Sequence, residues 1–316
     1  MSFKISIIPL DSFDLIELID ISSETHIQIC TRGALLNSWT IRNNGEIHEC
    51  IQGNDLDNGW HEFESNGFRS GKMSPFSCRI KNGQFEHLQQ KYTLEKFYLG
   101  AHAMHGLTYD APFILKTSTT NDESASVVLQ YDYKGTDRGF PFPYHVQVKW
   151  TLQKQNQIIV ETTLLNQYQQ TIPIMDGWHP YFTLGGIVND YTIQFYNQGK
   201  IEYDMDLIPT GKWLADNNFN EGKYIGEMHF DDCFKLNPIQ PSCTISNTSY
   251  SLRVTALQNY PYLQLYTPND RKSIAIENLS GVPDCFNNKM GIHYVKSQEQ
   301  ISFKTSYQIF IKQSPL

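Results

Sequence analysis

The stretch from Tyr144 to Leu152 reads YHVQVKWTL, and apolar and polar residues alternate along it without a break. A period of two residues is typical of a β-strand that turns one face toward a core. The C-terminal run from Ile301 to Ile311, ISFKTSYQIFI, follows the same period over most of its length. These two segments predict long strands and make β-structure the starting point for the fold.

Shorter alternating runs fill much of the remaining chain, and turn residues such as Asn-Gly, Asn-Asn, Pro and Gly interrupt many of them. The runs are Lys4–Pro9, Leu15–Ile19, His26–Cys30, Leu35–Arg42, Tyr92–Leu94, Val127–Tyr133, Ile158–Leu165, Tyr191–Tyr196, Leu252–Ala256, Tyr262–Tyr266 and Ser273–Glu277. Since no helical pattern exceeds about two turns, helices should be short and few. The sequence therefore predicts an all-β chain folded as a large antiparallel β-sandwich. It shows no Pro/Ser-rich linker and no repeat, so we expect a single domain over residues 1–316.

The composition argues against two classes of partner. The chain of 316 residues has a net charge of −8 and no block rich in Lys and Arg, so nucleic acid and anionic membranes are poor partners. Aromatic residues make up 13% and charged residues only 18%, while Asn, Gln, Ser and Thr are plentiful. A composition rich in aromatic and uncharged polar residues suits the binding of sugars. A β-protein with an aromatic core and a largely uncharged surface would, however, have the same composition.

The N-terminal residues and the cysteines indicate a cytoplasmic protein. The first residues, MSFKISIIPLD, lack the long apolar segment of a signal peptide. No stretch approaches the roughly 18 apolar residues of a membrane-spanning helix. The six cysteines form no C-x-x-C pair, so we expect reduced thiols rather than zinc ligands or disulfides.

Two strings place ionisable groups where strands are expected to end. Glu277 lies in SIAIENLSG (273–281), an alternating run followed by a turn, and His179 lies in DGWHPYF (176–182). A carboxylate on an apolar strand is costly to desolvate unless it finds partners, and such surroundings turn carboxylates into acids or bases. One base and one acid, each amid aromatic rings, suit chemistry on a small polar ring.

Four more strings occur in order along the chain: Arg79-Ile80, His105-Gly106, Gly139-Phe140-Pro141 and Asp231-Asp232. Together with His179-Pro-Tyr-Phe and Glu277, and at these spacings, they resemble the aldose 1-epimerase (mutarotase) family. Each motif alone is weak, but six in the right order are specific. The resemblance runs from about residue 35 to the C-terminus.

The resemblance implies a galactose mutarotase-like supersandwich of two large antiparallel sheets, with a sugar site on the concave face. It implies an isomerase that interconverts the α and β anomers of a free aldose, with no cofactor and no metal. Glu277 would be the general base and His179 the general acid. Arg79, His105 and Asp231 would hold sugar hydroxyls, and the oligomeric state stays open.

The roles of acid and base also lead to an expectation about which of the two groups, His179 or Glu277, is protonated. A nearby carboxylate should raise the pKa of His179 and keep the imidazole protonated close to neutral pH. Glu277, near Arg79 and His179, should then have the lower pKa of the two.

Three departures from the family pattern indicate a divergent branch. Cys78 stands where the family usually has Asn, and Asn278 stands where it usually has Pro. The segment before His105 reads GAHAM and lacks the Asn-rich lead of galactose mutarotases proper. The identity of the sugar is therefore not carried over.

Each candidate also has a purely structural interpretation. Glu277 could form an ion pair, His179 could be a core histidine, His105 could bond backbone in a turn, and Arg79 could brace a loop. One of Asp231 and Asp232 should be a turn residue. His102 and His105 lack an evident third ligand for a metal.

Other functions compete with epimerisation of a free aldose. A hexose-6-phosphate epimerase would need several arginines around the phosphate. A non-catalytic sugar-binding domain would need neither Glu277 nor His179. A lyase or glycoside hydrolase is weaker, because a glycosidase needs a second carboxylate beside the scissile bond.

Overall fold

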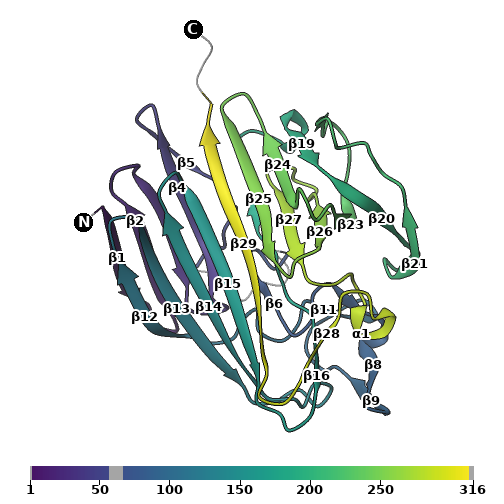
Figure 1. The fold of residues 1–316 in the computed structure, drawn as a ribbon. Coiled ribbons are helices and arrows are strands. Elements are labelled where there is room, and N and C mark those ends of the chain that lie inside the picture. Colours follow the sequence, from purple (N-terminus) through teal and green to yellow (C-terminus); the bar gives the residue numbers. More distant parts are fainter. Residues whose placement is uncertain (1, 57–66, 313–316) are drawn as a thin grey trace.

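The computed structural model describes residues 2–56 and 67–312, and its regular structure is almost entirely β. Antiparallel sheets lie in two layers, as the alternation predicts (Figure 1). The few helices are short: α1 (Cys285–Asn288) and the 3₁₀ turns η2 (Lys81–Gly83) and η3 (Val188–Asp190). The expectation of an all-β sandwich with few short helices is therefore confirmed for the described residues.

The first layer is a nine-stranded sheet. In spatial order its strands are β12 (Ile114–Thr120), β13 (Ser124–Tyr133), β14 (Tyr144–Gln153), β15 (Gln157–Asn166), β29 (Gln300–Ile311), β25 (Tyr250–Gln258), β24 (Ser242–Ser246), β19 (Thr192–Phe195) and β22 (Lys223–Tyr224). In Figure 1, β29 is the yellow strand between β15 and β25. The two long alternating runs of the sequence are thus β14 and β29, separated by one strand.

The second layer contains an eight-stranded sheet and a five-stranded sheet. The eight-stranded sheet has the order β21 (Pro209–Leu214), β20 (Asn197–Tyr203), β23 (Asp231–Leu236), β26 (Tyr262–Tyr266), β27 (Ile274–Leu279), β17 (Gly177–Trp178) and β6 (Lys72–Met73), with β18 (Tyr181–Phe182) paired to β27. The five-stranded sheet consists of β1 (Phe3–Pro9), β2 (Asp14–Asp20), β3 (Thr25–Cys30), β4 (Leu35–Asn43) and β5 (Glu46–Glu49). A bridge between Ile51 and Phe182 connects the two sheets.

Three small sheets complete the fold. They are β10 (Tyr98–Leu99) with β11 (His102–Met104) and β7 (Arg79–Ile80), then β8 (Gln84–His87) with β9 (Gln90–Thr93), and β16 (Ile172–Ile174) with β28 (His293–Val295). The first of them carries Arg79 and leads directly into His105.

Aromatic side chains fill the space between the layers. Trp150 of β14 meets Trp178 of β17 edge to face, with ring centroids 5.2 Å apart. Phe182 of β18 meets Tyr307 of β29 in the same way at 5.1 Å. Large aromatic rings remove much apolar area from water and prefer these tilted contacts. The strands that lead to His179 are therefore anchored on the nine-stranded sheet.

Two local expectations were wrong. Glu277 is not at the end of its strand, because Asn278 and Leu279 continue the pairing with Leu263 and Tyr262 of β26. Asp231 and Asp232 are both strand residues at the start of β23, where they pair with Tyr266 and Leu265. Asn278 and the pair Asp231-Asp232 are polar, so they interrupt the alternation of apolar and polar residues. The pattern therefore did not show that β27 continues past Glu277 or that β23 begins at Asp231.

The alternation along β14 predicts that substitutions on its buried face lower the free energy of unfolding much more than substitutions on its exposed face. We expect Leu152→Ala to lower the free energy of unfolding by about 2–5 kcal/mol, because the buried side chain leaves a cavity in the core. The matched control Lys149→Ala, on the exposed face of the same strand, should change it by no more than about 0.5 kcal/mol. Urea unfolding followed by tryptophan fluorescence measures both. Equal effects would show that β14 does not face the core as described.

Candidate active site

A cavity of about 630 Å³ opens on the eight-stranded sheet, and all the predicted site residues line it. Glu277 comes from β27, Asp231 from β23, and His179 from the residue after β17. Arg79 in β7 and His105 after β11 complete the set from the small sheet. Residues separated by nearly two hundred positions in the sequence therefore meet in one cavity of the size usual for small-molecule sites.

Glu277 and His179 form the closest ionisable contact in this cavity. Glu277 Oε1 lies 3.3 Å from His179 Nε2, and both side chains are buried. The other atoms of the two groups, Glu277 Oε2 and His179 Nδ1, are buried without a hydrogen-bond partner among the described residues. Buried polar atoms are nearly always hydrogen-bonded, so both atoms lack the partner that such atoms normally have.

The imidazole of His179 is fixed from several sides. Its backbone N–H donates to the Gly71 carbonyl (3.1 Å), and its carbonyl accepts from the Ser70 N–H (2.9 Å). The ring of Tyr181 stacks on it with centroids 4.8 Å apart and an angle of 13°. The ring of His105 meets it edge-on at 5.1 Å. These contacts hold the ring in one orientation toward Glu277.

The two pKa shifts run opposite to those expected from the sequence. Burial lowers the pKa of His179 to about 4. Burial, followed by the negative charge of Asp231, raises the pKa of Glu277 well above its ordinary value. Desolvation penalises the charged form of each group, and here it outweighs the attraction that a carboxylate exerts on an imidazolium. Both shifts favour the neutral forms, a protonated carboxyl group on Glu277 and an uncharged imidazole on His179.

His105 faces the cavity as a hydrogen-bond donor. Its Nδ1 accepts from the Cys78 N–H at 3.3 Å, so in the neutral ring the proton is on Nε2. Burial, and then the neighbouring His179, lowers the pKa of His105 well below its ordinary value. The Nδ1 contact with backbone is the structural role that the sequence left open, and it fixes the tautomer that His105 offers to a ligand.

The glycine after His105 is required by a close approach of backbone. Gly106 has φ +79°, and a Cβ at this position would lie 2.4 Å from the Ser74 carbonyl oxygen. Only glycine adopts this conformation without strain and leaves room for that contact. The His-Gly motif thus has a physical reason, since the glycine lets the turn carry His105 against the floor of the cavity.

Arg79 and Asp231 provide charge of opposite sign. None of the ion pairs among the described residues includes Arg79, so the interpretation as a loop brace finds no acidic partner there. Burial raises the pKa of Asp231, although the charge of Arg79 opposes the shift. Asp232 instead pairs with Lys200 at 3.0 Å, on the other face of β23. Of the two aspartates, Asp231 is the one at the cavity.

A chain of polar side chains that was not predicted from the sequence lies beside Asp231. The Tyr203 hydroxyl donates to Gln264 Oε1 (3.2 Å), and Gln264 Nε2 donates to Asp231 Oδ1 (2.9 Å). All three line the cavity. A signal was present, because Gln264 is an amide between Tyr262 and Tyr266 on the same face of β26. The cavity is further lined by aromatic rings of Phe68, Phe97, Tyr181 and Tyr266.

The two departures near the motifs have different consequences. Cys78 lines the cavity, so this substitution changes its wall. Asn278 points the other way, where its Oδ1 accepts from the Thr305 hydroxyl of β29 at 2.6 Å. The aromatic residues next to two of the motifs, Trp178 and Phe286, are both buried in the core and do not line the cavity.

Within the described ranges, no group of three or more His, Cys, Asp or Glu side chains is arranged to hold a metal ion. His102 turns its Nδ1 to the Asn82 N–H (3.0 Å), and it is absent from the cavity lining. The six cysteines are all free. None of the described helices is long and apolar enough to cross a membrane.

One solved structure shares this architecture, and two other known proteins are related to the chain in sequence. A galactose mutarotase-like protein from Clostridium acetobutylicum superposes with a TM-score of 0.85 at 15% identity, covering 98% of this chain and 99% of its own. The maltose epimerase of Levilactobacillus brevis is 22% identical over 269 residues, which are 78% of this chain and 77% of that protein. An Escherichia coli protein named YihR, described as uncharacterized, is 25% identical over 71% of this chain and 74% of its own.

The profile of one protein family matches nearly the whole chain. The family is described as aldose 1-epimerase, and the match covers residues 15–308. The low identities to individual relatives fit a divergent branch. The chain therefore belongs to the aldose 1-epimerase family and is an isomerase of that class, as its motifs predict.

Proposed function

We propose that this protein interconverts the α and β anomers of a free aldose by general acid and base catalysis at Glu277 and His179. The observation that carries the proposal is the buried pair of a carboxyl group and an imidazole, with Glu277 Oε1 3.3 Å from His179 Nε2. Such a pair offers one proton donor and one proton acceptor side by side, which is what opening a hemiacetal requires.

The reaction needs no net change in protonation. A base takes the proton from the C1 hydroxyl while an acid gives one to the ring oxygen, so the bond between C1 and the ring oxygen breaks and an aldehyde forms. After rotation about the C1–C2 bond, the ring oxygen attacks the other face of the carbonyl. Both protons then return along the same path, and the pair regains its starting state.

The family resemblance assigns the base to Glu277 and the acid to His179. The pKa shifts instead favour a protonated carboxyl group and a neutral imidazole, because burial penalises the charged form of each group. The assignment therefore requires that a bound sugar moves the proton from Glu277 to His179. Hydroxyl groups that donate to the carboxylate favour its charged form, and this effect opposes the cost of burial.

The charges around the cavity favour a neutral sugar over a phosphorylated one. Among the described lining residues, Arg79 is the one arginine, and Asp231 and Glu277 are carboxyl groups. A phosphate would need several cations, since it is usually held by clusters of Arg and Lys. Neutral hydroxyls can instead use the His105 Nε2–H and the Arg79 guanidinium as donors and Asp231 as an acceptor. Aromatic rings cover the apolar C–H faces of a sugar.

The size of the cavity leaves room for more than one sugar residue, and the relative from Levilactobacillus brevis carries the name of a disaccharide epimerase. We therefore include the reducing end of a disaccharide such as maltose in the range of substrates.

We predict that the protein accelerates anomer exchange of at least one unphosphorylated aldose in the presence of EDTA. Freshly dissolved α-glucose, α-galactose and maltose are followed by polarimetry, with glucose 6-phosphate in parallel. The reason is the neutral, metal-independent acid and base pair. Activity on the phosphate alone would move the assignment to a hexose-6-phosphate epimerase, and binding without any rate increase would indicate a sugar-binding domain.

Glu277→Gln should lower kcat roughly 10²–10⁴-fold and leave sugar binding nearly intact, because the amide keeps the size but exchanges no proton. Calorimetry measures binding, and NMR exchange spectroscopy measures turnover. The control Glu123→Gln neutralises an exposed carboxylate that pairs with Lys154, and it should leave both unchanged. A Glu277→Gln protein that keeps most of its turnover would remove Glu277 from the chemistry.

The pH dependence follows from the directions of the two pKa shifts. Activity requires the form of the pair with one proton, which exists between the two ionisations. On the acid side activity should fall near pH 4, where His179 takes up a second proton. On the alkaline side it should fall above the raised pKa of Glu277, where the last proton leaves. The profile of kcat/KM against pH should therefore be bell-shaped.

Nitrogen-15 NMR of the free protein tests the site of the proton directly. The ring of His179, assigned by its loss in His179→Asn, should stay neutral down to about pH 4. A ring that becomes protonated at or above the ordinary value of 6.5 would show that the imidazolium exists before sugar binds.

A further inference from the structure

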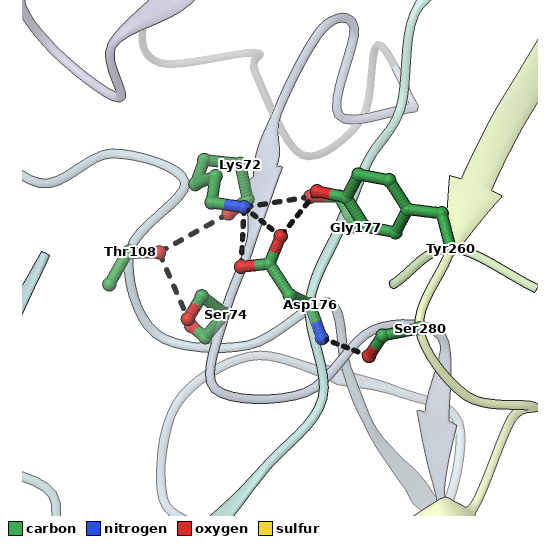
Figure 2. A network of polar contacts seen from close by, with 7 residues as sticks. All are labelled: Lys72, Ser74, Thr108, Asp176, Gly177, Tyr260 and Ser280. Carbon is green, nitrogen blue, oxygen red and sulfur yellow. Dashed lines mark hydrogen bonds and ion pairs between the residues drawn. The ribbon is translucent and has the colours of Figure 1, made fainter. Parts of the chain in front are cut away.

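Behind the sheet that carries the candidate active site lies a fully buried ion pair that the proposed chemistry does not use. Lys72 Nζ is 2.5 Å from both Oδ1 and Oδ2 of Asp176, and both side chains are wholly inaccessible to solvent. The ammonium group also lies 4.6 Å from the centre of the Trp178 ring. Figure 2 shows that the pair is the centre of a larger polar network.

The network connects several strands through Asp176 (Figure 2). The Tyr260 hydroxyl donates to Asp176 Oδ1 at 2.5 Å. The Asp176 N–H donates to Ser280 Oγ at 2.9 Å, and the Ser280 N–H returns a bond to the Asp176 carbonyl. Lys72 is in β6, Asp176 precedes β17, Ser280 follows β27 and Tyr260 precedes β26. Asp176 therefore joins four neighbouring segments of the eight-stranded sheet, two through its carboxylate and one through its backbone, in addition to its own.

These segments are the ones that carry the reacting pair. Lys72 pairs with Trp178 in register, and the preceding residue, Gly71, accepts the His179 N–H. Ser280 is three residues after Glu277, and Asp176 is three residues before His179. Three residues of strand span about 10 Å, so the network holds both strands within that distance of the reacting atoms.

A buried ion pair adds little to the net stability of a fold. Removing two charges from water costs free energy that their attraction regains only with good geometry, and an apolar pair of similar volume is often as stable. Directional bonds, however, fix the spacing and register of the strands that they join, which apolar contacts do less strictly. The value of this network therefore lies in geometry rather than in net stability.

We propose that Lys72, Asp176 and Tyr260 are positioning residues that set the distance between His179 Nε2 and Glu277 Oε1. None of the three lines the cavity, so they act through the strands and not by contact with substrate. Their removal should impair the transfer of protons while leaving the binding of sugar almost unchanged.

The test neutralises the pair at nearly constant volume with Lys72→Met/Asp176→Asn. The matched control is Lys304→Met/Glu161→Gln, which neutralises a half-exposed pair (3.2 Å) across β29 and β15 in the other layer. Because misplacement by about 1 Å can cost about 100-fold in rate, we expect kcat to fall about 10- to 100-fold with KM within about threefold. The control should keep the kcat of the wild type, and both proteins should melt cooperatively above the assay temperature.

A folded Lys72→Met/Asp176→Asn protein with wild-type kcat would overturn the proposal. So would a loss of activity that follows a loss of folded protein with kcat per folded molecule unchanged. Should the double variant not fold, Tyr260→Phe decides, since it removes one hydrogen bond and keeps the ion pair. We expect a loss of about threefold in kcat at unchanged KM for Tyr260→Phe, and no loss would refute the positioning role.

The measurements of kcat and KM rest on the proposed function. A second experiment therefore uses NMR of the protein without sugar. The nitrogen-15 signals of the His179 ring should shift or double in Lys72→Met/Asp176→Asn and in Tyr260→Phe, and stay unchanged in the control. If no sugar is turned over by the wild type, the proposed function fails while this NMR arm still tests the positioning role. Unaltered His179 signals in both variants would refute it.

Discussion

The burial of the Glu277 carboxyl group in the interior of a strand is the constraint around which this molecule is organised. Every residue of β27 is buried, and Glu277 lies in its interior rather than at its end. Because a buried charge is costly, the group must either find a partner or keep its proton, and here it does both beside His179. The neighbouring strands supply that partner and its fixed orientation, and the nine-stranded sheet excludes water from behind.

Several polar groups of the cavity are held in fixed orientations by contacts within the protein. The Cys78 N–H fixes His105 as a donor, the chain from Tyr203 through Gln264 fixes Asp231, and the stacked Tyr181 ring fixes His179. Each of these orientations comes from a contact within the protein, so little has to move when a ligand arrives. Hydrogen-bonding groups that are already oriented cost less free energy to engage, which suits a reaction that involves only proton transfers.

The fold could be predicted from the sequence because alternation reports directly which face of a strand is buried. Thus Tyr262–Tyr266 is β26 to the residue, and the runs at Tyr144 and Ile301 became the long strands of the first layer. The site residues were found through motifs, and the structure brings all of them to one cavity. Two things were not predicted. The alternation marks Gln264 as an amide among tyrosines, but the order of the strands decides that its face lines the cavity. The pKa of Glu277 is raised by the depth of its burial, which no local pattern encodes.

The bond between Asn278 and Thr305 has a consequence for how the chain reaches this state. Glu277 and Asn278 are adjacent, yet one faces the cavity and the other bonds β29 through the core. A slip of β27 by one residue would exchange them and place the carboxyl group among apolar rings of the opposite layer. Such a mispaired intermediate would be strongly disfavoured. The residue expected to do the chemistry therefore also helps to select the correct register of β27 during folding.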